Sequence, residues 1–164
     1  MIGILHRHIV PAAYAVLPVR MDSQAATAML LAIALQESGA RVRHQTPTGP
    51  ARGFWQFEAG GGVFGVQTHP RTALALEGAL SALCYPPRMG QFLLHSIIEH
   101  NDVLACVMAR LLLYTLPEAL PGPSDAAIGW TQYRAAWRPG HPHPDTWPGF
   151  YATAWAMVSA EWET

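Results

Sequence analysis

The chain contains no lysine, little charge of either sign and only two cysteines. Charged residues make up 13% of its 164 residues, and the formal net charge is −1. A domain that binds nucleic acid usually carries a basic surplus, so we expect no nucleic acid as a partner. All ten basic residues are arginine, whose planar guanidinium makes forked contacts with carboxylates and polar sugars.

Long hydrophobic runs are also absent. The two most apolar stretches, 25–35 and 103–116, are shorter than the roughly 20 residues that a membrane-spanning helix needs, so we expect no membrane span. The N-terminus lacks a secretory signal, because His6, Arg7 and His8 interrupt its first apolar stretch. We therefore expect no export through a leader of its own.

The two cysteines and the histidines offer little for metal binding. Cys84 and Cys106 have apolar neighbours along the chain, and free cysteine behaves as a small buried hydrophobe; we favour this interpretation over a disulfide. The histidine pairs in 6–8 and 141–143 have i, i+2 spacing, which brings both rings to one side only on a strand. No His-Glu-x-x-His helix occurs, so we expect no metal ion and no other cofactor.

The composition is that of a folded domain. Hydrophobic residues make up 51% of the chain, unlike a disordered segment, and the length suits one domain with a core and a cleft. There is no strand pattern, internal repeat or heptad pattern. We therefore predict a mainly α-helical single domain that spans residues 1–164.

The clearest helix is predicted over Gln24–Ser38. Asp22 or Ser23 can cap its start, because a short side-chain oxygen accepts from the free amides of the first turn. Gly39 suits the left-handed position that ends a helix. The helix is apolar nearly all round, which is typical of a helix in the middle of a core, until it ends in a polar Gln-Glu-Ser triplet at 36–38.

Other elements follow from apolar spacing and from the capping and breaking residues between them. Further helices are predicted over 72–84, 91–99, 103–115, 125–137 and 150–162. Asn101 or Asp102 caps the third of these. We expect residues 1–21 to be an irregular apolar lead-in, 60–62 to be a flexible glycine turn and 138–149 to be a rigid, proline-rich loop.

Glu37 stands at the exposed end of the apolar helix, where two effects act on its carboxyl group in the same direction. Apolar neighbours disfavour the charged form, and the partial negative charge of a helix C-terminus also disfavours an anion. Both raise the pKa of Glu37, so the group can keep its proton near neutral pH, as protonation of a glycosidic oxygen requires. The alternative is an ordinary solvated glutamate in the last turn.

The residues that follow narrow the interpretation. The pair Glu37-Ser38 is followed, after a polar loop, by Gly-Phe-Trp-Gln-Phe at 53–57. This pattern resembles the soluble lytic transglycosylase and goose-type lysozyme superfamily, in which a Glu-Ser pair ends a helix and Gly-Leu-Met-Gln follows a polar loop. Phe54 and Trp55 stand where Leu and Met are usual. The match is close over about a quarter of the chain and loose in the helical order of the rest.

The resemblance implies a lysozyme-like domain with a central buried helix and a glycan-binding cleft. It makes Glu37 the general acid, and afterwards the base, that cleaves the β-1,4 bond between N-acetylmuramic acid and N-acetylglucosamine in peptidoglycan. Ser38 would position the carboxyl group or the substrate, and Gln56 and backbone groups near Phe57 would hold N-acetyl groups. Trp55 suits a cleft wall, since a flat ring packs on a sugar face; the alternative for Trp55 is a core residue.

The superfamily's third motif, Ala-Tyr-Asn-Ala-Gly, is altered in this chain. The nearest stretch is 127–133, where either Trp130 with Thr131 or Tyr133 takes the place of the Tyr-Asn pair. We therefore count Trp130 and Tyr133 among the candidate substrate-binding residues. The aromatic residues at 137–155 could form a further glycan platform, although we favour packing against the core.

A second carboxylate decides the reaction. An inverting hydrolase needs a base about 6.5–9.5 Å from the acid; Glu58 is the first candidate and Glu77 the second, the alternative for Glu58 being a solvated loop residue. A lytic transglycosylase needs neither, because the substrate's own 6-hydroxyl closes onto the anomeric carbon. The sequence leaves both reactions open.

The chain also resembles small phage or prophage proteins of this superfamily, which agrees with the missing export signal. Such a protein would stay in the bacterial cytoplasm or in a phage virion and would reach the wall through a holin or with virion proteins. The alternative function is a virion or peptidoglycan-binding module with a lysozyme-like fold and little or no catalytic activity.

Overall fold

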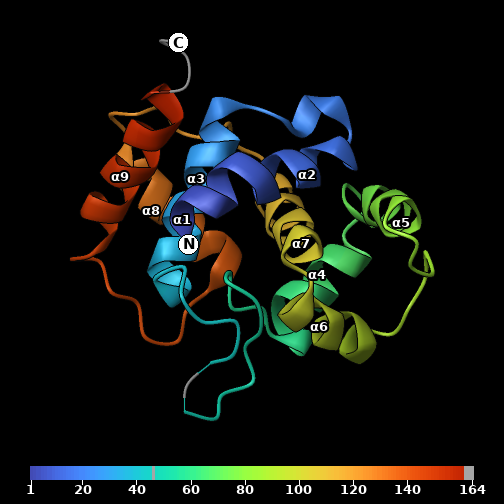
Figure 1. Ribbon diagram of the computed structural model, residues 1–164. Coiled ribbons are helices and arrows are strands. Elements are labelled where there is room, and N and C mark those ends of the chain that lie inside the picture. The colour runs from blue at the N-terminus through green and yellow to red at the C-terminus, as the bar shows by residue number, and fades with distance from the viewer. Residues whose placement is uncertain (46, 161–164) are drawn as a thin grey trace.

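The computed structural model describes residues 1–45 and 47–160, and within those ranges the protein is mainly helical, with no strand (Figure 1). Isolated bridges join His44 to Arg52 and Arg52 to Phe57. The helical elements in chain order are α1 (Ile2–Ile4), η1 (Leu5–Ile9), α2 (Val10–Ala15), η2 (Val19–Met21), α3 (Gln24–Ser38), η3 (Ala59–Val63), α4 (Phe64–Thr68), α5 (Ala73–Ala82), α6 (Gln91–His100), α7 (Asp102–Tyr114), α8 (Ala126–Trp137) and α9 (Trp147–Ala160).

Two helices form the centre of the molecule. Every residue from 28 to 34 on α3 is fully buried, and every residue from 104 to 113 on α7 is buried. α3 packs against α9 and α7, while α7 also contacts α2, α5, α6 and α8. The predicted buried helix is therefore confirmed, and a second buried helix accompanies it.

The ends of these helices follow from local sequence. The Ser23 hydroxyl accepts a hydrogen bond from the backbone N–H of Ala26 at 3.1 Å, so Ser23 rather than Asp22 is the N-cap of α3. Gly39 ends the helix with φ 61°, the left-handed conformation that glycine adopts without cost. Asn101 caps α7 through its side-chain oxygen.

The prediction of an irregular lead-in was wrong, because residues 1–21 are largely helical. Pro11 did not prevent this: it lies where the π-helical turn η1 passes directly into α2, and the backbone before it is helical. Leu5, Val10 and Ala13 anchor the segment in the core. Apolar burial therefore outweighs the breaking effect of proline here.

Two smaller expectations also need correction. α9 begins at Trp147 rather than at 150, because Pro148 is accommodated in its first turn; the end predicted at Trp162 lies outside the described residues. The glycines at 60–62 form a helical turn, η3, rather than a simple flexible turn, and only Gly61 leaves helical geometry. The helices predicted over 72–84, 91–99, 103–115 and 125–137 agree with α5, α6, α7 and α8 to within two residues at each end.

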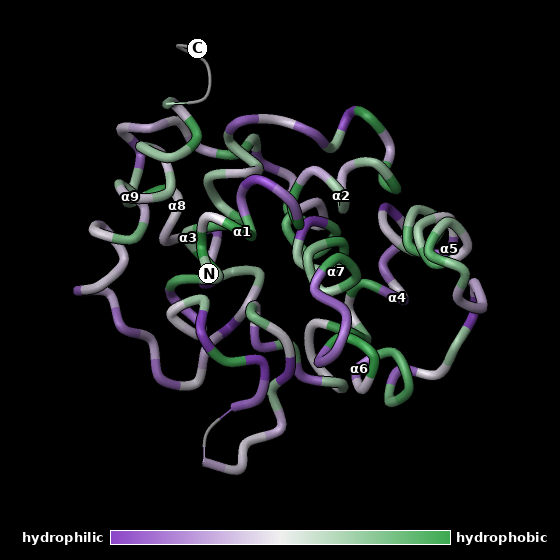
Figure 2. Tube along the Cα trace, viewed as in Figure 1, coloured by the Kyte–Doolittle hydropathy of each residue, from purple (hydrophilic) through white to green (hydrophobic). Residues whose placement is uncertain are grey.

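Hydropathy follows this layout. In Figure 2, α7 and α5 are mostly hydrophobic, whereas the loop that follows α3 is largely hydrophilic. None of the helices in the described part of the chain is long and apolar enough to cross a bilayer. Both cysteines are free: Cys106 is buried as predicted, but Cys84 is exposed, so the prediction of a buried thiol was wrong there.

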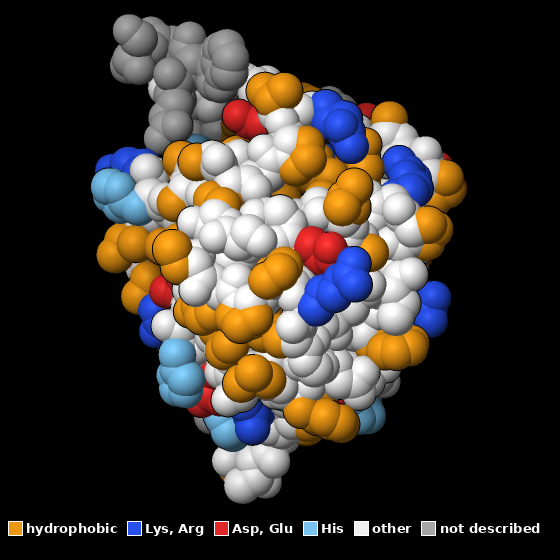
Figure 3. Space-filling view, turned by 90° about the vertical axis from the view of Figure 1, so that its right-hand side faces the viewer, with side chains coloured by type: hydrophobic (Ala, Val, Ile, Leu, Met, Phe, Trp, Pro, Cys, Tyr) orange, Lys and Arg blue, Asp and Glu red, His pale blue; other side chains and the backbone are white. Residues whose placement is uncertain are grey.

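The face that carries α5 and α6 shows several separate hydrophobic groups rather than one continuous apolar patch (Figure 3). The most exposed apolar residues of α5 and α6 are Leu74 on α5 and Phe92 and Leu93 on α6. Arg88 forms an ion pair with Glu77 of α5 at 2.9 Å. The carboxylate of Glu77 is therefore already paired at the surface.

Candidate active site

A groove with a volume of about 920 Å³ opens beside the C-terminal end of α3. This volume is within the range of about 300–1,000 Å³ that is typical of ligand sites. Its walls come from the loop between α3 and η3, from η3 and α4, and from the end of α8 with the loop that follows. Of the eight predicted site residues, five line the groove: Glu37, Gln56, Phe57, Glu58 and Tyr133.

Glu37 is the most perturbed acid of the groove. Its carboxyl group is partly buried, and its Oε1 accepts a hydrogen bond of 2.5 Å from the hydroxyl of Tyr133. Burial raises the pKa of Glu37 from its usual 4.5 to about 7; the hydrogen bond from Tyr133 lowers it, and the negative charge of Glu58 raises it further. Near neutral pH, Glu37 is therefore populated in both the protonated and the ionised form.

The position of Tyr133 resolves one alternative left by the sequence. Its ring stacks on Trp147 with centroids 5.2 Å apart, and the ring of Trp130 packs on both. Burial, followed by the charge of Glu37, raises the pKa of Tyr133, so the phenol stays a hydrogen-bond donor. Tyr133, and not Trp130 with Thr131, is the residue that meets the acid.

Trp130 does not line the groove, although we predicted that it binds substrate. Its contacts with Tyr133 and Trp147 place it among the aromatic rings between α8 and α9. Spacing along a helix did not distinguish a ring that supports Tyr133 from one that faces the groove.

Trp55 is fully buried, so its predicted role as a cleft wall was wrong. Its indole N–H donates to the backbone carbonyl of Leu30 on α3 at 2.8 Å, and its own carbonyl accepts from the indole of Trp137 at 2.8 Å. The apolar surface of α3 takes up the ring, and the paired N–H removes the cost of burying it. The groove is lined by the ring of Trp137 instead.

Ser38 acts on the loop rather than in the groove. Its hydroxyl donates to the backbone carbonyl of Phe54 at 2.7 Å and contacts that of Ala34 at 3.1 Å. Ser38 therefore holds the segment 53–57 at the end of α3, next to Glu37, and does not itself line the groove.

Gln56 keeps a hydrogen-bond acceptor without a partner, whereas the backbone groups of Phe57 are already paired. Gln56 has a positive φ of 49°, and its side-chain N–H donates to the carbonyl of Gly53 at 2.8 Å; its Oε1 has no partner among the residues that the structure describes. The N–H of Phe57 donates to Arg52, and its carbonyl accepts from Arg52 and from His95. The backbone of Phe57 is therefore already paired and does not offer the sugar contacts that we predicted.

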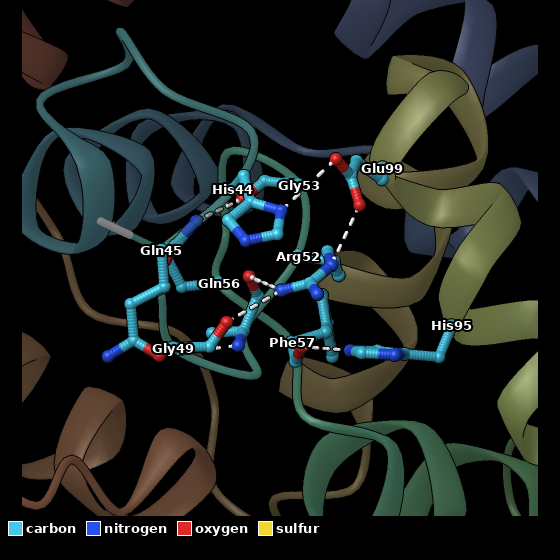
Figure 4. A network of polar contacts seen from close by, with 10 residues as sticks. His44, Gln45, Gly49, Arg52, Gly53, Gln56, Phe57, His95 and Glu99 are labelled. Carbon is cyan, nitrogen blue, oxygen red and sulfur yellow. Dashed lines mark hydrogen bonds and ion pairs between the residues drawn. The ribbon is translucent and has the colours of Figure 1, made fainter. Parts of the chain in front are cut away.

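An ionic network fixes this loop against α6 (Figure 4). Glu99 of α6 pairs with Arg52 at 2.7 Å and with His44 at 3.3 Å. The ring of His95, also on α6, reaches the carbonyl of Phe57 at 2.8 Å. The loop is thus held at several points, so the groove's floor is preorganised before any ligand binds.

Glu58 is the remaining candidate for the second carboxylate. Glu58 is exposed and lines the groove, and its charge is close enough to affect Glu37. Glu77 lies on α5, is paired with Arg88 and does not line the groove, so it is no longer a candidate. Among residues 1–45 and 47–160, no three His, Cys, Asp or Glu side chains come together so that they could hold a metal ion.

The aromatic C-terminal part divides into two groups. Trp147, Tyr151 and Trp155 are buried, which confirms the interpretation that they pack against the core. Trp137 and Arg138 line the groove instead, and the sequence did not separate them from the others. The only local signal was their place at the end of a predicted helix.

No known family matches the chain, and neither do any curated protein or any solved structure. The assignment of a function therefore depends on the groove and on the residues in it.

Proposed function

We propose that the protein cleaves the glycan strands of bacterial peptidoglycan at the β-1,4 bond between N-acetylmuramic acid and N-acetylglucosamine, with Glu37 as the general acid. The proposal is carried by one observation, the carboxyl group of Glu37 inside the groove under the hydroxyl of Tyr133. A glycosidic oxygen leaves readily once it is protonated. A carboxyl group with a pKa of about 7 can give that proton and take one back.

The groove offers contacts that suit a polar sugar with apolar faces. The ring of Trp137 is partly exposed in the groove and packs on the buried ring of Phe57, with their centroids 5.9 Å apart. Flat rings pack on the C–H faces of sugars. The free Oε1 of Gln56 can accept from the N–H of an N-acetyl group, and this would align the strand with Glu37.

Two reactions fit this site, and they differ in the nucleophile. In hydrolysis, Glu58 would activate a water that adds to the anomeric carbon while Glu37 protonates the leaving oxygen. In transglycosylation, Glu37 would first protonate the glycosidic oxygen, whose bond to the anomeric carbon breaks. The Glu37 carboxylate would then take the proton of the substrate's 6-hydroxyl as that oxygen bonds to the anomeric carbon. The first reaction leaves a reducing end and the second an anhydro-sugar.

The test is the release of soluble fragments from purified peptidoglycan by the parent, by Glu37→Gln and by the control Glu118→Gln, an exposed change away from the groove. Loss of a general acid lowers the rate by about 10²–10⁴-fold, and the control should match the parent. Equal release by the parent and by Glu37→Gln would remove Glu37 from the mechanism. Mass spectrometry of the fragments then separates the two reactions.

The same experiment tests the alternative function, a wall-binding module with little or no catalytic activity. The altered third motif, with Trp130 outside the groove, favours a module that holds the wall without cutting it. A parent that binds the wall and releases no fragments would be such a module. Residence in the bacterial cytoplasm or a virion, and delivery by a holin or virion proteins, stay predictions.

A further inference from the structure

Arg138 has an unusual backbone and an unused side chain. It ends α8 in the left-handed conformation, with φ 50° and ψ 52°, which a residue with a Cβ disfavours. Its guanidinium is exposed at the groove and has no hydrogen bond or ion pair among the residues that the structure describes. Strained residues of this kind are often held at binding sites.

Hydrogen bonds hold the chain on either side of Arg138. Before it, the indole of Trp137 donates to the carbonyl of Trp55. After it, the side chain of Gln36 donates to the carbonyl of His143 at 3.0 Å and contacts the hydroxyl of Thr146 at 3.1 Å. Gln36 directly precedes Glu37, so one turn of α3 fixes both the acid and the loop that follows Arg138.

The groove contains charged side chains of both signs. Glu37 and Glu58 are its acids, and the hydroxyl of Tyr133 on α8 donates to Glu37. Arg138 is the only arginine among the described residues that line the groove. It stands five residues beyond Tyr133, which is about 7.5 Å along the helix axis.

We propose that Arg138 is a specificity-determining residue that binds a carboxylate on the peptide branch of the peptidoglycan strand. This rests on the proposed function. The branch leaves the muramic acid unit and carries free carboxylates, and an extended peptide covers at most about 3.3–3.6 Å per residue, so three of its residues are long enough to span the distance along α8. A guanidinium holds a carboxylate through two parallel hydrogen bonds.

Two glycines of the groove wall leave room for such a branch. Gly60 and Gly65 line the groove, and a Cβ built on either would meet no atom within 4 Å. Neither glycine is therefore required by packing. A branch in the groove would meet open space at these two positions.

The experiment measures binding in a Glu37→Gln background, which should not turn substrate over. The probes are the disaccharide of N-acetylglucosamine and N-acetylmuramic acid with its tetrapeptide and the same disaccharide without peptide, titrated by calorimetry. Arg138→Gly removes the charge and keeps the left-handed conformation, which glycine favours. Arg138→Lys keeps the charge, and Arg134→Ala changes an exposed arginine of α8 that does not line the groove.

We expect Arg138→Gly to weaken binding of the peptide-bearing probe by about 10-fold or more, as loss of charged hydrogen bonds does, and to leave the bare disaccharide unchanged. Arg138→Lys should keep part of the affinity for the peptide-bearing probe. The control Arg134→Ala should bind this probe as tightly as the protein in which both arginines are present. Any of three results would overturn the proposal: equal weakening for both probes, no weakening for the peptide-bearing probe, or no binding of that probe with Arg138 present. Failure of the parent to cut the wall would refute cleavage alone, since binding is measured without turnover.

Discussion

Replacing Glu37 with glutamine is expected to stabilise the fold at alkaline pH, although it removes the proposed acid. Burial raises the pKa of Glu37 from 4.5 to about 7 in the folded protein. The folded state therefore binds this proton more tightly than the unfolded state does. The resulting stability is fully present below pH 4.5 and is lost as the pH rises through about 7. Above that pH, the fold contains a poorly solvated anion that glutamine does not introduce.

The size of the effect follows from the shift. Each pKa unit corresponds to about 1.36 kcal/mol, so a shift from 4.5 to about 7 sets an upper limit of about 3 kcal/mol. The carboxyl group faces a groove that is open to water, which screens part of this. We therefore expect Glu37→Gln to gain about 2 kcal/mol over the parent at pH 8.5, which is roughly 4–8 °C in Tm for a chain of this length.

Urea and thermal unfolding, followed by circular dichroism between pH 4.5 and 8.5, would measure this difference. The two proteins should be similar at pH 4.5 and should separate as the pH passes 7. The exposed change Glu118→Gln serves as the matched control and should show no such trend. A gain that does not vary with pH, or a Glu37→Gln variant that is less stable than the parent at pH 8.5, would refute the assignment of a buried, proton-binding carboxyl group.

Three further changes test other parts of the site. Tyr133→Phe removes a hydrogen bond that lowers the pKa of Glu37, so the alkaline limb of the pH–rate profile should move up by about one pH unit; an unmoved limb would contradict this. Glu99→Gln breaks the ion pair with Arg52 that holds the loop, and steady-state kinetics should show a KM raised several-fold with a smaller change in kcat; a fall in kcat alone would argue against a positioning role. Trp55→Phe removes a buried hydrogen bond and core volume, and urea unfolding should show a loss of about 2–4 kcal/mol; a loss below about 1 kcal/mol would mean that the indole contributes little.

The parts of the fold that were predictable are those fixed by local chemistry. Ser23 and Gly39 mark the ends of α3 because a hydroxyl and a left-handed glycine act within one turn. Residues 1–21 were not predictable in this way, since their helices depend on burial against distant elements such as α7. Proline therefore marks the end of a helix only where the neighbouring residues gain no apolar burial from a helical conformation.

The site shows the same division. The short stretch around Glu37 and Ser38 was informative, because the carboxyl group and the loop anchor are neighbours in sequence and in space. The partner of Glu37 is 96 residues away, and the sequence could offer Tyr133 only as one of two alternatives. Whether Trp55 faced the groove or the core depended on a backbone carbonyl of α3, and residue types alone carry no information about that.

The properties of Glu37 and the stability of α3 have one physical origin. α3 runs from the core to the groove, so its last turn is still partly buried, and this burial raises the pKa of the carboxyl group. A more solvated end would relieve the ionised Glu37 and stabilise the protein at alkaline pH, but it would also return the acid to an ordinary pKa. Tyr133 limits the conflict, because its hydrogen bond stabilises the anion without admitting water. A variant selected for stability at high pH should therefore lose the proton of Glu37 at neutral pH, and with it the proposed acid catalysis.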